Sequence, residues 1–540
     1  MFHQLLTPVG NRLGLSFFVA SLPVVTILVL LGILKRPAWQ AALAGLVVGL
    51  AVAVTAWQMP VALALDAALD GSVYALWPVM WIVVNALLLY NIAVRSGRFD
   101  AFRNWVMIHL PNDRRVILVV IGFCFGALLE GVAGFGTPVA ITSSLLIAVG
   151  FPPLEALVFV LIFNTAPVAF GALGTPVTML GAVTGLPAAT LAAMIGRQLP
   201  VMAIILPFYV MALYGGWRSV RAIWPVLLVA GASFGLTQFL ASNFIDYKLT
   251  DVLSSLGSLI VTVLFLRSWR PAADPEFAIN AEARAFAHPA SAVAAWQGWL
   301  PWLIVSAIVI VWTHFKMSAL GQHDIPWPGL HNAIAITLYH DKPYAAIWSF
   351  QPLATGTAIL AACVITAGAV RLPPAAFLRC VGETLRQVWL AVVTVMLIVA
   401  LAFLMNYSGL VYTLGQGVAS TGKWFVLFSP FLGWVAVMLS GSDTSGNALF
   451  GNLQVVAARQ LGLSPVLFAA TNSSGGVMGK MISPQNITTG VCVTKLKGRE
   501  GAVFARTFVH SIVLTLLLVL LVVIQQYLFP GVIPGSGAAP

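Results

Sequence analysis

Apolar runs of membrane-spanning length follow one another along almost the whole chain. Each is roughly 17–25 residues long, the length that a helix needs to cross the hydrocarbon core of a bilayer. The 540 residues are only 8% charged, whereas soluble domains carry about 25% charged residues. The sequence therefore predicts an all-α polytopic membrane protein with about twelve spans, near 15–34, 38–57, 72–94, 116–135, 190–214, 223–243, 249–267, 299–315, 352–370, 387–406, 423–440 and 508–528.

Two regions, 136–189 and 441–494, interrupt this series. Both are apolar overall but are rich in Gly, Pro, Ser, Thr and Asn. Irregular backbone at membrane depth is tolerated only where protein or a water-filled cavity satisfies its N–H and C=O groups. Paired interruptions in two halves of a chain are the best sequence indication of a transporter's substrate site. We therefore expect broken or re-entrant hairpins here, and a secondary transporter for a small polar or anionic solute.

The excess of cations, which gives a net charge of +11, indicates topology and not nucleic-acid binding. Cytoplasmic loops of membrane proteins are enriched in Lys and Arg. Alternating the twelve spans places nineteen of the 27 Lys and Arg residues on one side and five on the other, if each broken region makes an even number of crossings. Loops 95–115 and 371–386 are then cytoplasmic. Loops 316–350 and 407–422 and both termini are predicted to face the periplasm.

The two halves of the chain are predicted to be inverted copies. At an offset of 312 residues, Gly150 corresponds to Gly462 and Pro153 to Pro465. Spans 72–94 and 387–406 correspond as well, yet the cation pattern gives them opposite directions. Inverted repeats supply alternating access by moving one unit against the other. The expected units are a first half (1–214, with a broken-helix module at 116–214), connecting helices and a cytoplasmic loop (215–298), and a second, inverted half (299–540, with a broken-helix module at 423–528).

Six charged residues remain in the broken-helix modules 116–214 and 423–528 once the others are assigned to loops or helix ends. Charge within a membrane is costly and is by default a functional hypothesis. Glu155 fits the first turn of a helix, and Arg459 fits a hairpin turn. Glu130 and Asp443 lie where an apolar helix gives way to a glycine-rich break, so we expect one or both to couple transport to protons. A structural ion pair with a nearby cation is the equally favoured alternative.

Two cations complete the set, Arg197 and Lys480, and are candidates for binding a substrate carboxylate. Arg offers a bidentate fork and Lys a point charge. Neutral hydrogen bonds to substrate are expected from Asn164, Thr165, Asn472, Ser473 and Ser474, although polar contacts between helices would explain them equally well. No metal site and no cofactor are expected, because the cysteines and histidines lack ligand spacing and the chain has no Walker-type sequence.

Four segments resemble the bacterial lactate permease family. They are GALLEGVAGFGTPVAI (126–141), FNTAPVAFGALGTPVTMLG (163–181), SGSDTSGNALFGNLQ (440–454) and TNSSGGVMGKMISPQNI (471–487). Chain length and hydropathy resemble that family throughout. The resemblance implies an inner-membrane carrier that takes up L-lactate, and often D-lactate and glycolate, together with protons. It implies no binding residues, so the residue roles above depend on physical argument alone.

Three alternatives remain open from the residues. A sodium-coupled carrier of other small carboxylates is one, because open carbonyls and hydroxyls at broken helices also suit Na⁺. An anion channel is the second. An intramembrane enzyme is the third, although the chain has no HExxH or GxSxG sequence to support it.

Overall fold

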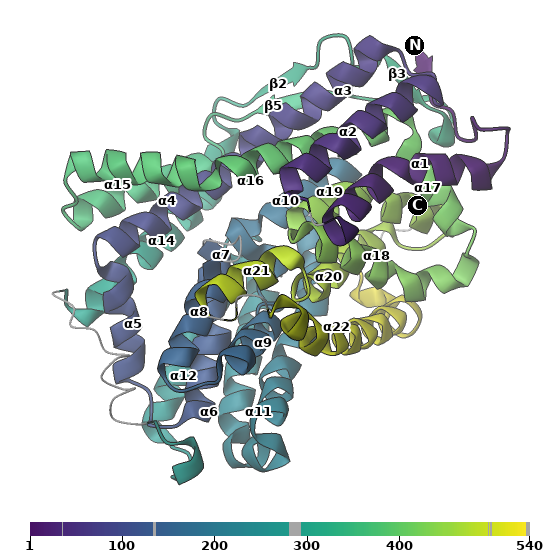
Figure 1. Ribbon diagram of the computed structural model, residues 1–540. Helices are drawn as coiled ribbons and strands as arrows, with labels where there is room; N and C mark the ends of the chain where they lie inside the picture. The colour runs from purple at the N-terminus through teal and green to yellow at the C-terminus, as the bar shows by residue number, and fades with distance from the viewer. Residues whose placement is uncertain (35, 133–136, 280–292, 495, 497–498, 536–540) are drawn as a thin grey trace.

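Long apolar helices make up most of the structure, a computed structural model that describes residues 1–34, 36–132, 137–279, 293–494, 496 and 499–535 (Figure 1). Within these ranges ten helices are long and apolar enough to cross a membrane, or eleven if one bent pair forms a span. The predicted all-α, multi-pass membrane fold is confirmed. The helices of the first half are α1 (Leu13–Leu28), α2 (Ala38–Thr55), α3 (Val61–Tyr74), α4 (Trp81–Arg95), α5 (Arg98–Ile108), α6 (Arg114–Ile117), α7 (Gly126–Val132), α8 (Thr137–Ala148), α9 (Pro153–Phe163), α10 (Gly171–Thr184), α11 (Ala188–Leu240) and α12 (Thr250–Ser268).

The helices after residue 298 follow the same pattern of long spans and short broken pieces. They are α14 (Leu300–His314), α15 (Thr355–Ala369), α16 (Pro374–Ser408), α17 (Leu410–Ala419), α18 (Phe425–Ser440), α19 (Asp443–Gln460), α20 (Pro465–Lys480), α21 (Pro484–Val493) and α22 (Glu500–Val523).

The number of helices differs from twelve because some predicted spans are continuous or short. The spans predicted at 190–214 and 223–243 are both part of α11, which departs from helical geometry at Gly215, Gly216 and Ile223. The span predicted at 352–370 is α15, which has only 15 residues. Hydropathy alone does not resolve a bend within a helix.

Several helices extend beyond their predicted bounds. Helix α3 begins at Val61 and continues through a π-helical turn containing Pro78 into α4, so this span starts before residue 72. Helix α16 begins at Pro374, within the predicted loop 371–386. Helices α5 and α17 lie within loops 95–115 and 407–422. Polar or basic helix ends lower the mean hydropathy, and a hydropathy window therefore misses them.

Small β-sheets join the N-terminus to loop 316–350. Strand β1 (Phe2–His3) pairs in parallel with β3 (Ile334–Ile336), which pairs antiparallel with β4 (Lys342–Pro343). Strands β2 (His323–Pro326) and β5 (Ile347–Phe350) form an antiparallel ribbon. Hydrogen bonds from Ser349 and Gln322 hold the pKa of the Asp324 carboxyl in this ribbon below its usual value. The sequence prediction of a plain loop omitted these strands.

Hydrogen bonds and ion pairs join the loops and helix ends into two separate groups. The side chain of Gln4 donates to the Asn406 and Tyr407 carbonyls, so the N-terminus lies against the end of α16 as well as against β3. In the other group, Arg95 Nη1 lies 2.9 Å from Glu383 Oε2 and joins the end of α4 to the start of α16. Each group joins segments that the cation pattern predicts on one side of the membrane.

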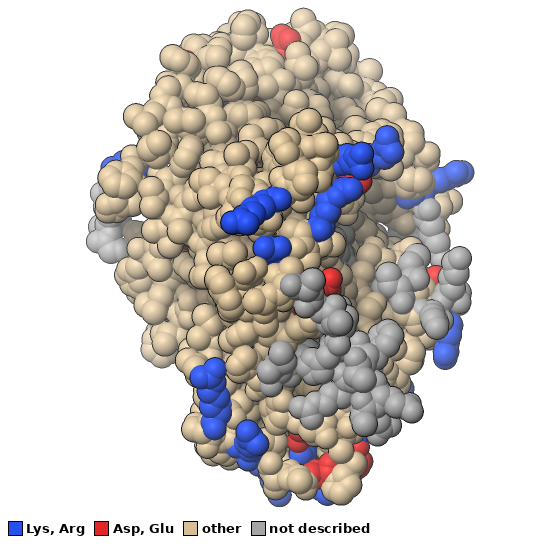
Figure 2. Space-filling model, turned by 90° about the vertical axis from the view of Figure 1, so that its left-hand side faces the viewer, with Lys and Arg blue, Asp and Glu red and all other residues tan. Residues whose placement is uncertain are grey.

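The second group also contains the segment that follows α12. Buried Arg115 forms ion pairs with Asp113 and with Asp274, and Arg218 approaches the same Asp274 at 3.2 Å. Figure 2 shows one flank of the molecule, on which Lys and Arg side chains gather at mid-height and at the lower end. The upper part of this flank is almost free of charge.

The broken regions show the same order of elements twice. In the first, α7 ends at Val132 and α8 and α9 follow before α10; in the second, α18 ends at Ser440 and α19 and α20 precede α21. Pro153 and Pro465 both begin a helix, and Gly150 and Gly462 both have left-handed backbone before it. Helix α9 and the pair η4–α10 (Val168–Thr184) are bent by 62° at their break.

Buried apolar side chains form two large clusters that meet near the broken regions. One contains side chains of α9, α11, α12 and α20, and the other contains those of α1, α2, α3 and α16. The helical segment Arg114–Val132 is wholly enclosed by protein. In Figure 1, α7, α10, α19 and α20 occupy the middle of the molecule. Polar residues in these elements are therefore shielded from lipid.

The two groups of contacts lead to a prediction for membrane topology. In a variant without cysteines, we expect Ala319→Cys and Ser420→Cys to react with an impermeant maleimide added to intact cells. We expect Gly382→Cys to react only after the membrane is opened, because loop 371–386 carries the basic residues of a cytoplasmic loop. Labelling of Gly382→Cys and Ser420→Cys from the same side would contradict the inverted-repeat arrangement.

Candidate functional site

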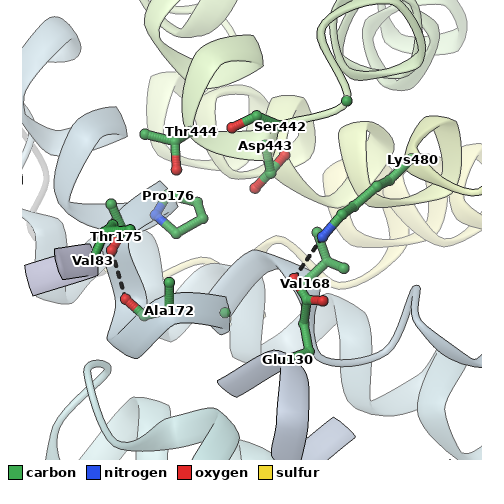
Figure 3. A pocket seen from close by; sticks show the side chains of 12 residues that line it. Val83, Glu130, Val168, Ala172, Thr175, Pro176, Ser442, Asp443, Thr444 and Lys480 are labelled. Atoms are coloured by element: carbon green, nitrogen blue, oxygen red, sulfur yellow. Dashed lines mark hydrogen bonds and ion pairs between the residues drawn. The ribbon is translucent and has the colours of Figure 1, made fainter. Parts of the chain in front are cut away.

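A small cavity lies between the two broken regions (Figure 3) and has a volume of about 40 Å³. A cavity needs roughly 10–15 Å³ to hold one water molecule, so this one accommodates only a small solute. Its walls come from α4, α7, α10, α19 and α20. The lining residues are Val83, Glu130, Val168, Gly171, Ala172, Thr175, Pro176, Gly441, Ser442, Asp443, Thr444 and Lys480.

A buried ion pair crosses the cavity. Lys480 Nζ lies 2.5 Å from Glu130 Oε1, and the two side chains are 7% and 3% exposed. The Asn164 amide donates to the other Glu130 oxygen at 3.0 Å. Figure 3 shows Lys480 extending from α20 toward Glu130 on α7. The ends of the two broken regions are thus joined by opposite charges, which is the usual condition for burying either one.

Two of the charged side chains in the cavity lie at helix ends. Lys480 is the last residue of α20, where the negative end of the helix dipole favours a cation. Asp443 is the first residue of α19, where the positive end favours an anion. The Ser442 hydroxyl caps α19 by accepting from the Ser445 N–H. Both side chains are therefore stabilised by the breaks that the sequence predicted.

Asp443 uses one of its two carboxylate oxygens. Its Oδ2 accepts from the Ser473 hydroxyl at 2.5 Å and from the Asn447 amide at 3.3 Å. Its Oδ1 is buried and has no hydrogen-bond partner among the described residues. Oδ1 packs against Gly476 of α20, so the carboxyl group must turn before this oxygen can accept from a solute in the cavity.

The floor of the cavity is a left-handed turn at the start of α10. Ala172, Leu173 and Gly174 have φ values of 45°, 56° and 74°. Left-handed backbone at a residue with a Cβ is strained, and such strain concentrates at functional sites. The Ala172 carbonyl accepts from the Thr175 hydroxyl at 2.6 Å. This turn breaks the regular helix beside Glu130 and exposes backbone to the cavity.

Close packing of α18 against α20 positions Lys480. A Cβ atom at Gly475 would overlap the Pro430 carbonyl oxygen, and one at Gly479 would overlap the Trp434 carbonyl oxygen. Glycines four residues apart allow two membrane helices to approach closely. The spacing of Gly475 and Gly479 therefore fixes the distance between α18 and α20 at the end that carries Lys480.

The structure separates the two candidate cations. Lys480 lies in the cavity, whereas Arg197 does not line it. The Arg197 Nε donates to Asn243 Oδ1 at 3.0 Å, and its Nη1 donates to the Val532 carbonyl. Glu155 lies in the first turn of α9 as predicted, and Arg459 lies in the last turn of α19 and donates to the Tyr339 hydroxyl.

The five neutral candidates surround the cavity without lining it. Asn164 donates to Glu130, and Ser473 donates to Asp443. Asn472 donates to Asn447 at 3.0 Å and so supports a partner of Asp443. Ser474 donates to Gln198, and the Thr165 hydroxyl, in the turn after α9, donates to the Ile162 carbonyl. All five are buried; Asn164 and Ser473 contact residues that line the cavity, and the other three contact residues that do not.

Sequence reasoning missed Asp251, which we had placed at a loop edge. It is 1% exposed in α12, beside Gly131. Its signal in the sequence is a series of polar residues at helical spacing on an otherwise apolar span: Asp251, Ser254, Ser255, Ser258 and Thr262. Within the described ranges, no group of three or more His, Cys, Asp or Glu side chains is placed to hold a metal ion.

The chain matches the protein family described as L-lactate permease over residues 16–529. It is 41% identical to the L-lactate permease of Salmonella typhimurium, over 99% of this chain and 100% of that one. It is 40% identical to the glycolate permease GlcA of Escherichia coli, over 98% and 99% of the two chains. It is 39% identical to the L-lactate permease of Bacillus subtilis, over 98% and 99%.

Two solved transporter structures are similar at low identity. The Alcanivorax borkumensis YdaH transporter aligns over 82% of this chain and 84% of its own, with 15% identity and a TM-score of 0.42. Neisseria gonorrhoeae MtrF aligns over 83% and 81%, with 15% identity and a TM-score of 0.43.

The glycine contacts provide a test of how the cavity is positioned. We expect Gly479→Ala to abolish transport. It should also lower the free energy of unfolding of the purified protein by about 1–3 kcal/mol or more, because the added methyl group overlaps α18. Gly368→Ala in α15 is the matched control, since nothing lies within 4 Å of its added Cβ. Unfolding in detergent and uptake into vesicles measure the two effects. Normal stability and transport in Gly479→Ala would contradict this packing.

Proposed function

Since the chain belongs to the L-lactate permease family, we propose that it takes up L-lactate, and also D-lactate and glycolate, across the bacterial inner membrane together with protons. The observation that carries the proposal is the Lys480–Glu130 ion pair, buried in a cavity that both broken regions build. The printed names of the relatives support lactate and glycolate as the substrate class. Membership in a family of permeases also indicates a transporter and not an enzyme.

Lys480 binds the substrate carboxylate in this proposal. It is the cation that lines the cavity among the described residues, and its ammonium group already holds a carboxylate there. A substrate anion competes with Glu130 for this group. The cavity volume of about 40 Å³ limits the site to a small solute. Once its carboxyl group turns, the free Oδ1 of Asp443 is available to accept from the 2-hydroxyl group, which lactate and glycolate share.

Competition for Lys480 couples substrate to protons. When a substrate carboxylate displaces Glu130, Glu130 remains buried without a cation. The penalty for an unpaired buried charge is several kcal/mol, so Glu130 takes up a proton instead. The loaded site then contains Lys⁺, the substrate anion and a neutral Glu130, and has the same net charge as the empty site. One proton therefore accompanies each anion, and release of both restores the ion pair.

Alternating access follows from movement of one part of the protein against another. The repeated order of helices around the two broken regions supports inverted repeats, with units at 1–214 and 299–540 joined by 215–298. The cavity also lies where the two apolar clusters meet: Val168 belongs to one, and Val83 and Ala172 belong to the other. Sliding at this boundary would open the cavity to one side and then the other.

The alternatives predict different transport behaviour. A sodium-coupled carrier would lose uptake when Na⁺ is replaced by another cation at a constant pH gradient, whereas the proposed symporter would not. A channel would show no counterflow of labelled lactate driven by unlabelled lactate. These measurements, made on proteoliposomes with an imposed pH gradient, distinguish the proton symporter from the sodium-coupled carrier and from the channel. Inhibition by Na⁺ removal alone would favour the first alternative.

The role of Lys480 leads to a prediction for substrate affinity. We expect Lys480→Gln to raise the apparent KM for lactate by roughly tenfold or more, because a hydrogen bond to a charged group contributes about 1.5–3 kcal/mol. Arg197→Gln is the matched control and should leave KM almost unchanged, since Arg197 lies outside the cavity. Initial uptake rates at varied lactate concentration measure both.

A single substitution at Lys480 leaves Glu130 without its cation, so protein abundance must be measured as well. The double variant Glu130→Gln/Lys480→Gln removes both charges and keeps two groups that can form a hydrogen bond. We expect it to reach the membrane and still bind lactate weakly. Normal KM in this double variant, or a larger effect from Arg197→Gln, would contradict the assignment.

The role of Glu130 leads to a prediction for coupling. We expect Glu130→Gln to mimic the protonated form, so lactate exchange continues while accumulation driven by a pH gradient is lost. A gradient of about one pH unit should give the unmodified protein roughly tenfold accumulation at one proton per anion. Glu383→Gln is the control, because Glu383 lies in an exposed ion pair.

Asp443→Asn is measured in the same vesicles, because Asp443 also lines the cavity and is the second candidate for proton coupling. If Asp443 binds the 2-hydroxyl group instead, the variant should keep its accumulation ratio but bind lactate more weakly. Full accumulation by both single variants at Glu130 and Asp443 would refute the coupling scheme.

A further inference from the structure

Asp251 is a buried carboxyl group that the proposed transport cycle has not used. Both of its carboxylate oxygens are buried and have no hydrogen-bond partner among the described residues. Burial of a polar group without a partner costs free energy, and the cost is much larger for an ion than for a neutral acid. The first turn of α12 favours a carboxylate, but this position supplies no hydrogen-bond partner for either oxygen among the described residues.

Asp251 packs against Gly131, the residue that follows Glu130 of the ion pair. A Cβ atom built on Gly131, the residue after Glu130, would lie 3.1 Å from Asp251 Oδ2. Among the described residues, the charged groups that act electrostatically on Asp251 are Glu130 of α7 and Lys480 of α20. A larger residue at position 131 would crowd this carboxyl group, which lies close to the backbone there.

A buried polar stripe continues from Asp251 along α12. Ser254, Ser255, Ser258 and Thr262 are all fully buried and share one face of the helix. The Ser258 hydroxyl donates to the Ala230 carbonyl at 2.8 Å and lies 3.2 Å from the Cys124 thiol of the enclosed segment, and Thr262 faces the same thiol. The stripe leads from the ion pair toward the end of α12 at Ser268, which is followed by the segment predicted to be cytoplasmic.

We propose that Asp251 is a second proton-carrying residue of this transporter, which receives the proton from Glu130 and passes it to the polar stripe of α12. The inference rests on the proposed function. When the substrate leaves, Lys480 attracts Glu130, the O–H bond of Glu130 breaks and an O–H bond forms at Asp251. The proton then leaves by way of the stripe, and Asp251 is ready for the next cycle. Chains of acidic and polar side chains serve as proton relays in other membrane proteins.

A relay changes the rate of net transport and not its stoichiometry. We expect Asp251→Asn to slow net uptake driven by a pH gradient by roughly tenfold or more, because loss of a positioned acid–base group typically costs 10²–10⁴ in rate. Exchange of labelled for unlabelled lactate should stay within about twofold of the unmodified rate, since it needs no proton release. A merely structural defect would lower both rates together, so their ratio in the same proteoliposomes is the decisive measurement.

Two further variants complete the test. Asp70→Asn removes another buried carboxyl group, which accepts from the Tyr407 hydroxyl and does not line the cavity. This variant should leave the ratio of net uptake to exchange unchanged. Thr262→Val removes the buried hydroxyl group that faces the Cys124 thiol and keeps the shape of the side chain, so the variant should fold normally. It should slow net uptake relative to exchange if the stripe carries protons.

The outcomes separate this inference from the proposed function. An unchanged ratio in both Asp251→Asn and Thr262→Val would overturn the relay while leaving proton symport intact. Equal losses of net uptake and exchange in Asp251→Asn, with a normal ratio in Thr262→Val, would also overturn it and assign Asp251 a structural role. If lactate uptake by the unmodified protein moves no protons, detected with a pH-sensitive dye inside the vesicles, the proposed function itself fails.

Discussion

The ion pair between Lys480 and Glu130 connects the parts of the structure that matter for function. Each residue lies at the end of a broken helix, and neither is tolerable at this depth without an opposite charge. The pair therefore requires both broken regions to meet, and the cavity forms where they do. Helix dipoles, the glycine contacts of α18 and α20, and the left-handed turn at Ala172–Gly174 all help to keep the two ends in place.

Much of this arrangement was predictable because membrane insertion imposes simple rules on a sequence. Each of the twelve predicted apolar runs is helical over most of its length, since a backbone in lipid must satisfy its own hydrogen bonds. The same rule makes charge in an apolar region conspicuous. Glu130, Asp443 and Lys480 were therefore identified as functional candidates, and all three line one cavity.

The features that the sequence did not reveal depend on side-chain direction and on contacts between distant segments. Arg197 and Lys480 are both cations among apolar and small residues in the sequence. Lys480 faces Glu130 because α20 ends at the cavity, whereas the Arg197 side chain donates to Asn243 and Val532. Asp251 was overlooked because it begins a span, where charge is ordinary. The β-strands near the N-terminus pair residues more than three hundred positions apart, and local sequence patterns carry no information on such pairing.

The enclosed segment Arg114–Val132 also sets a requirement for assembly in the cell. Residues 115–132 contact protein on every side in the finished structure, and most of the helices that pack against them, α8, α9, α10, α11 and α12, follow the segment in the chain. Glu130 and Lys480 are 350 residues apart in the chain, and chains are synthesised from the N-terminus at about 5–20 residues per second. Glu130 therefore leaves the ribosome well before Lys480 has been made. The helices that follow the enclosed segment must close around it after it has been made, and its ion pair with Lys480 can form only when most of the chain has been synthesised.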